Sequence, residues 1–91
     1  MKSAYELAME RLQQQAPTKS LTDVQKAELA ELDSRYKAKI AEREIALGDE
    51  MSAAQAAGDF AKVDEARDRL ASERARLLSE RDERKQRVRG E

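Results

Sequence analysis

The fold of this chain is decided at residues 55–62, which read Gln55-Ala56-Ala57-Gly58-Asp59-Phe60-Ala61-Lys62. Glycine suits the left-handed position just after a helix, and aspartate suits the N-cap of the next one. Gly58 and Asp59 therefore predict that one helix ends here and another begins at once. Outward from this turn at 57–59, the sequence predicts helices over about residues 22–57 and 59–89.

The other boundaries have their own signals. Thr22 suits an N-cap, and Gln25 stands three positions later, where it completes a capping box. Pro17 is the only proline, and the residue before a proline avoids the helical region. We therefore expect an amphipathic helix over about residues 3–15. The predicted organisation is an N-terminal helix in 1–16, a linker in 17–21 and a helical hairpin in 22–91.

Apolar residues face one another if the chain folds back at Gly58 and facing residue numbers sum to 117. Leu47 then meets Leu70, and Ile40 meets Leu77. We expect the seam to be richest near the turn and in the middle of the hairpin. Its predicted members are Leu29, Tyr36, Ile40, Leu47, Ala54, Phe60, Val63, Leu70, Leu77 and Val88.

The same register predicts contacts between charged side chains. It pairs Glu50 with Arg67 and Asp33 with Arg84, and it sets Tyr36 against Arg81 for a cation–π contact. It also sets Arg43 against Arg74, which is unfavourable unless both turn outward. The carboxylates available to receive them are Glu42, Glu44 and Glu73.

Composition agrees with a long, thin, helical molecule. Charged residues make up 41% of the 91 residues, and the aromatic residues are Tyr5, Tyr36 and Phe60. A chain rich in Ala, Glu, Lys, Arg and Leu with helical periodicity is typical of coiled coils. Full disorder is the competing interpretation, and the regular apolar stripe argues against it. The predicted fold class is all-α, a long antiparallel two-helix coiled-coil hairpin preceded by a short helix.

Several function classes are disfavoured. The chain has no cysteine and no histidine, so a thiol nucleophile, the commonest general base and the commonest transition-metal ligand are missing. We expect no enzyme activity, no cofactor and no metal. No apolar run approaches the roughly 20 residues that span a bilayer, and the N-terminus lacks the apolar core of a secretory signal. We therefore expect a cytoplasmic protein that does not bind membranes.

Several residues around the turn have the spacing of a known helical motif. They are Met51, Asp59-Phe60, Val63, Arg67-Asp68 and Leu70. Residues 51–70 resemble the UVR motif, a short helical hairpin of the B and C subunits of bacterial excision nuclease and of some Clp adaptor proteins. The resemblance implies protein–protein docking by helix pairing, often hairpin against hairpin. The chain departs from that motif at Ala61 and Lys62, where acidic residues are usual.

Because an isolated hairpin buries only a narrow stripe, we expect further packing. The leading hypothesis is a non-catalytic interaction or scaffold module that forms a homodimer, and the N-terminal helix is an alternative third member of the bundle. Its apolar face supplies candidate partner contacts, which are Tyr5, Met9 and Leu12.

The alternative function is binding to nucleic acid or the ribosome. Residues 61–91 carry ten basic and eight acidic side chains, a balance of +2. Basic side chains release counterions when they bind phosphates, but acidic residues are interleaved and base-stacking aromatics are missing here. The candidate phosphate contacts are Arg74, Arg81, Arg84, Lys85, Arg87 and Arg89.

Overall fold

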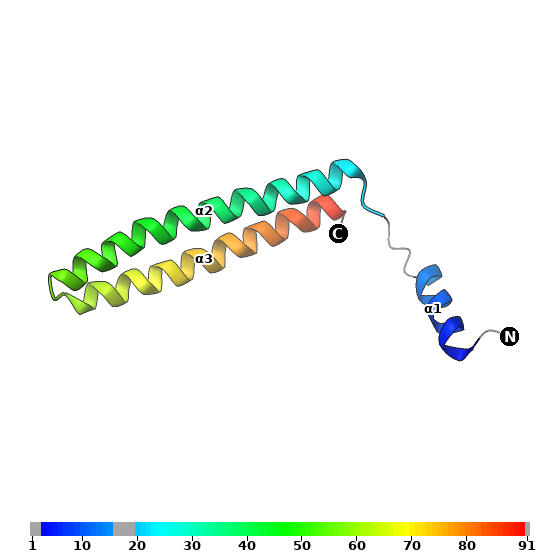
Figure 1. Cartoon of the computed structure of the whole chain (residues 1–91), viewed down its shortest axis with the longest axis horizontal. Coiled ribbons are helices and arrows are strands. Elements are labelled where there is room, and N and C mark those ends of the chain that lie inside the picture. Colours follow the sequence, from blue (N-terminus) through cyan, green and yellow to red (C-terminus); the bar gives the residue numbers. More distant parts are fainter. Residues whose placement is uncertain (1–2, 16–19, 91) are drawn as a thin grey trace.

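The chain folds into one helical hairpin and one separate short helix (Figure 1). The structure, a computed structural model, describes residues 3–15 and 20–90, with residues 12–15 described for the backbone alone. Its elements are α1 (Ala4–Gln15), α2 (Asp23–Ala56) and α3 (Phe60–Arg89). The predicted all-α hairpin is confirmed, and the described residues contain no strand. The predicted linker at 17–21 lies largely outside the described residues.

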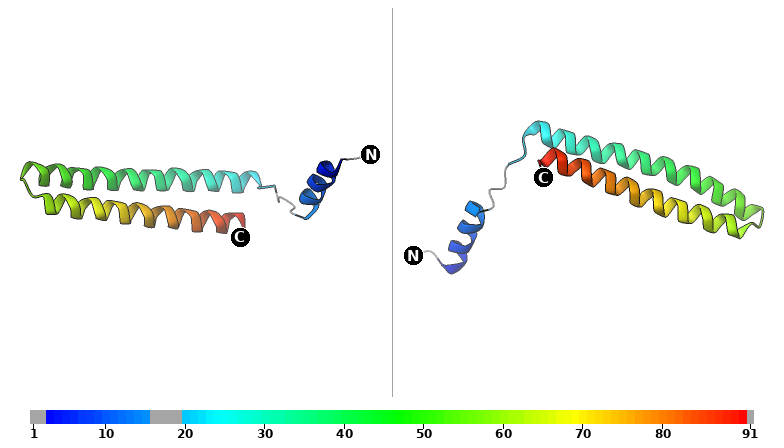
Figure 2. Two further views of the ribbon diagram at one scale, coloured as in Figure 1. Left: turned by 90° about the horizontal axis from the view of Figure 1, so that it is seen from below. Right: turned by 180° about the vertical axis from the view of Figure 1, so that it is seen from behind.

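α2 and α3 lie side by side and antiparallel in all the views of Figures 1 and 2. α1 packs against neither of them within the described residues. The alternative in which the N-terminal helix is a third member of the bundle is therefore not found among the described residues. The seam between α2 and α3 is the only packed interface among the described helices.

Both helix starts have the predicted chemistry. The Thr22 hydroxyl accepts a hydrogen bond from the Gln25 backbone N–H at 3.1 Å, and the Thr22 N–H donates to the Gln25 side chain at 2.8 Å. This reciprocal pair is the predicted capping box. Asp59 caps α3 by accepting from the Lys62 N–H at 3.2 Å. Each cap satisfies backbone donors that have no partner inside the helix.

The reversal at Gly58 is a Schellman motif. Gly58 has a φ of +73°, which glycine adopts without the steric cost that a Cβ brings. The Gly58 N–H donates to the Gln55 carbonyl at 3.1 Å, and the Asp59 N–H donates to the Ala54 carbonyl at 2.9 Å. These two bonds satisfy carbonyls at the end of α2 and close the turn within the predicted residues 57–59.

Large side chains fill the half of the seam that lies away from the turn. Tyr36 is fully buried, and it clusters with Leu32 and Leu77, while Ile40 and Val88 pack against this cluster. Of the ten predicted seam residues, five are buried, namely Leu29, Tyr36, Leu47, Ala54 and Leu77. Four are half-buried, namely Ile40, Val63, Leu70 and Val88. The expectation of a rich seam in the middle of the hairpin agrees with the full burial of Leu47, but the expectation of a rich seam near the turn is wrong, because only alanines are buried there.

Phe60 is the seam prediction that fails, because its side chain is 67% exposed. Near the turn the seam is filled by the methyl groups of Ala54 and Ala66, both buried. Phe60 lies six residues before buried Ala66, which is about 120° away around α3, so its side chain points to one side of the seam. Ala66 and Leu32 are buried members that the pairing argument missed.

Ion pairs across the seam follow the predicted register with shifts of one or two residues. Asp33 pairs with Lys85 at 2.8 Å rather than with Arg84, and Glu50 pairs with Arg69 at 3.4 Å rather than with Arg67. Side chains of this length reach a neighbouring turn, so the backbone register does not fix the partner. The two arginines that the register opposes do turn outward, with Arg43 to Glu73 at 2.6 Å and Arg74 to Glu44 at 3.6 Å.

Tyr36 also has different neighbours from those predicted. The Lys39 ammonium lies 5.0 Å and the Arg84 guanidinium 5.8 Å from the ring centroid, both within cation–π range. The Tyr36 hydroxyl donates to Glu80 at 3.4 Å. Arg81, the predicted cation, pairs instead with Asp82 at 2.9 Å.

Candidate interaction surfaces

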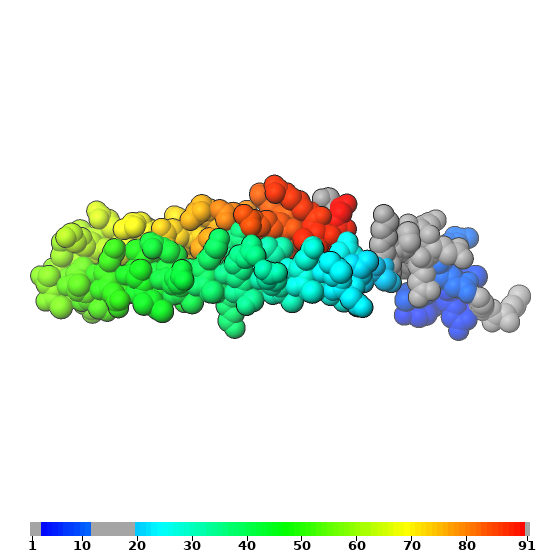
Figure 3. Space-filling model, turned by 90° about the horizontal axis from the view of Figure 1, so that it is seen from above, coloured from blue at the N-terminus to red at the C-terminus, as the bar shows by residue number. Residues whose placement is uncertain are grey.

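The hairpin has two long flanks, one on each side of the seam. Asp33 and Glu44 are eleven residues apart, which is close to three helical turns, so both lie on one strip of α2. We call this side the Asp33 flank; it is bridged by Lys85–Asp33 and Arg74–Glu44. The opposite side, the Arg43 flank, is bridged by Arg43–Glu73 and Arg69–Glu50. Figure 3 shows α2 and α3 running along the hairpin body, with no other described segment covering the face in view.

Two ion pairs across the seam shift the pKa values of the groups that form them. Lys85 donates a hydrogen bond to Asp33 and thereby lowers the pKa of that carboxyl, with smaller contributions from the charges of Arg81 and Arg89. Arg43 likewise lowers the pKa of the Glu73 carboxyl, and Glu73 raises the pKa of the guanidinium. Because these groups are close to solvent, each pair adds little to the stability of the hairpin.

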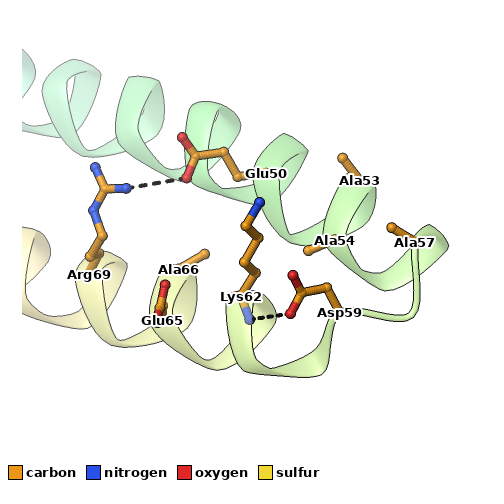
Figure 4. A pocket seen from close by; sticks show the side chains of 9 residues that line it. All are labelled: Glu50, Ala53, Ala54, Ala57, Asp59, Lys62, Glu65, Ala66 and Arg69. Carbon is orange, nitrogen blue, oxygen red and sulfur yellow. Dashed lines mark hydrogen bonds and ion pairs between the residues drawn. The ribbon is translucent and has the colours of Figure 1, made fainter.

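A groove next to the turn is the best-formed hollow on the Arg43 flank. It has a volume of about 430 Å³. In Figure 4 the side chains of Ala54 and Ala66 lie between the two helices, and the Glu50–Arg69 ion pair closes the end away from the turn. Its remaining lining residues are Ala53, Ala57, Asp59, Lys62 and Glu65. An apolar floor with a charged rim suits an apolar side chain of a protein partner.

The Asp33 flank carries a wider and shallower hollow of about 660 Å³. The half-buried side chain of Ile40 lies in it between Asp33 and Glu44 on α2, with Arg81 and Lys85 on α3. Lys37 and Ala41 complete the lining. This flank therefore combines apolar and charged side chains over its length.

The candidate phosphate contacts are mostly engaged within the hairpin. Arg74 pairs with Glu44, Arg81 with Asp82 and Lys85 with Asp33, while Arg84 lies over the Tyr36 ring. Arg89 adds to the positive field at Asp33, and Arg87 is exposed. A phosphate has to compete with these carboxylates, so the basic end of α3 is a weaker anion surface than its sequence indicates.

The N-terminal helix presents apolar side chains to solvent. Tyr5 is 73% exposed and Met9 is 43% exposed. The side chain of Leu12, the third predicted contact, lies outside the described residues. Leu7 is also exposed, on the other side of α1 from Tyr5, and the sequence argument missed it. The predicted docking face thus lacks an intramolecular partner within the described residues.

Among the described residues, no group of histidine, cysteine or acidic side chains is placed to hold a metal ion, and no helix has the length and apolarity needed to cross a membrane. Comparison of the chain with protein-family models, with curated proteins and with solved structures gave no match.

Proposed function

We propose that this chain is a non-catalytic protein–protein interaction module that self-associates as a homodimer through pairing of its helices. The observation that carries the proposal is the distribution of apolar side chains. The hairpin seam encloses Tyr36 and Leu47 but leaves Phe60 67% exposed and Leu78 37% exposed on α3. Apolar side chains outside the seam favour burial against another surface.

The charge pattern supports the same proposal. Lysine and arginine stand beside acidic residues along both helices, and eight ion pairs join them within the described residues. Such a surface resists non-specific aggregation while it leaves the narrow apolar strips available for a matched helix. The resemblance of residues 51–70 to the UVR motif points to the same kind of contact, hairpin against hairpin.

Sedimentation equilibrium of the full chain over micromolar concentrations tests self-association. We expect a species of twice the 10.3 kDa chain mass. A mass of one chain at every concentration overturns the homodimer.

The exposed apolar face of α1 supports a second contact, with another protein, and we place it in the cytoplasm. Capture from an extract of the native cell with the full chain and with a chain lacking residues 1–16 tests this part. We expect a protein retained by the full chain and lost on truncation. Equal retention by both chains assigns partner binding to the hairpin instead.

A further inference from the structure

The Asp33 flank carries several apolar side chains that the hairpin only partly covers. On α2, Ile40 and Met51 are eleven residues apart and half-buried, so they lie on one strip. On α3, the side chains of Val63 and Leu70 are half-buried, and those of Phe60 and Leu78 lie beside them and are exposed. Arg74 lies fourteen residues after Phe60 and four before Leu78, and both spacings are close to whole helical turns, so the three residues share one side of α3. Arg74 pairs with Glu44, so this side belongs to the Asp33 flank.

Charge is divided between the two helices. α2 carries eight acidic and five basic side chains, a balance of −3, whereas α3 carries seven acidic and ten basic side chains, a balance of +3. On the flank itself α2 carries Asp33, Glu44 and Lys37, whereas the strip of α3 opposite them carries the basic residues Arg67, Arg74, Arg81 and Lys85.

Two arrangements with two-fold symmetry bring this flank against itself in a second copy. If the turns of both hairpins lie at the same end, α2 of each copy packs over α3 of the other. If the turns lie at opposite ends, α2 packs over α2 and α3 over α3. The first arrangement brings the basic strip of α3 against an α2 strip that carries Asp33 and Glu44. The second brings the four basic side chains of each α3 strip against the same four in the other copy, which is destabilising. Charge complementarity therefore selects the arrangement with both turns at one end.

The flank is large enough for a stable dimer. The 30 residues of α3 extend about 45 Å, and two helices side by side are about 20 Å wide. The product is about 900 Å² on each copy, against about 800 Å² per partner in a typical specific interface. In this arrangement Ile40 lies level with Leu78 of the second copy, because Ile40 faces α3 near Leu77 within its own hairpin.

We propose that two copies of this chain pair through their Asp33 flanks, with both turns at the same end and α2 of each copy on α3 of the other. The inference rests on the proposed self-association and adds the surface and the orientation. The interface consists of Ile40, Met51, Phe60, Val63, Leu70 and Leu78, with Asp33, Glu44, Arg74 and Lys85 along it.

A matched pair of variants tests the surface. Leu78→Arg places a charge in the interface at a position that is 37% exposed within the hairpin, so the helices themselves tolerate it. Ile45→Arg makes a similar change at a position that is 67% exposed. Ile45 lies nine residues, or two and a half helical turns, after buried Tyr36, so it is on the side of α2 that faces away from the seam. We expect Leu78→Arg to weaken dimerisation by at least tenfold in sedimentation, with the helical circular dichroism retained, and Ile45→Arg to leave it unchanged.

A spin label tests the orientation. The chain contains no cysteine, so Gln55→Cys gives one label near each turn, at an exposed position. Turns at one end give a label separation below about 30 Å, and turns at opposite ends give about 45 Å, the length of α3.

Three outcomes separate the claims. A monomeric wild-type chain overturns the proposed function itself. If the wild-type chain dimerises and the Leu78→Arg variant dimerises equally well, the proposed interface is wrong. If the label separation is near 45 Å, the proposed orientation is wrong while self-association stands.

Discussion

Leu47 gives the sharpest test of the seam, because its side chain is fully buried between α2 and α3. Leu47→Ala leaves a cavity that a thin hairpin fills only partly, and such changes cost about 2–5 kcal/mol. For roughly 70 ordered residues at about 0.05–0.15 kcal/mol each, the whole free energy of unfolding is about 3.5–10 kcal/mol. The single change therefore removes a large share of it.

The measurement is urea unfolding followed by helical circular dichroism, at one fixed protein concentration because association adds to apparent stability. Ile45→Ala is the control, since that side chain is 67% exposed, and we expect it to stay within about 0.5 kcal/mol of wild type. If Leu47→Ala unfolds at the same urea concentration as Ile45→Ala, the packing argument for the hairpin fails.

Three further predictions concern α2, pH and nucleic acid. Gly48→Ala should raise the free energy of unfolding by up to about 1 kcal/mol, because the added Cβ meets no atom within 4 Å; a lower urea midpoint contradicts this. The lowered pKa values of the Asp33 and Glu73 carboxyls contribute stability that is complete above their unfolded values near pH 4 and is lost as pH falls through the lower folded values. Thermal unfolding between about pH 6 and 2 should show this loss, and Asp33→Asn with Glu73→Gln should reduce its slope. In a gel shift at about 0.15 M salt, RNA and DNA should migrate unchanged, since most basic side chains of α3 already contact carboxylates.

The turn and the caps were predictable because their chemistry is local. Gly58, Asp59 and Thr22 each act through backbone groups within four residues, and the structure places each in its predicted role. The centre of the seam was predictable for a different reason. Large side chains such as Leu47 and Leu77 have no alternative burial in a two-helix molecule, so the antiparallel pairing identifies them.

The sequence argument failed where three-dimensional spacing decides. Phe60 was assigned to the seam because the antiparallel register pairs it with Ala57, but it lies about 120° around α3 from buried Ala66. That error also concealed the Asp33 flank, since an exposed Phe60 is part of the evidence for it. The partner of Asp33 was wrong by one residue, because Lys85 reaches the carboxylate whereas Arg84 turns to the Tyr36 ring.

The burial of Tyr36 gives the molecule its own optical probe. The chain has no tryptophan and only two tyrosines, and the side chain of Tyr5 is 73% exposed. A tyrosine signal in the near-ultraviolet circular dichroism therefore arises chiefly from the ring held between Lys39 and Arg84. Its disappearance reports the separation of α2 from α3 even while each helix keeps its backbone hydrogen bonds, so opening of the pair and melting of the helices are distinguishable without any added dye.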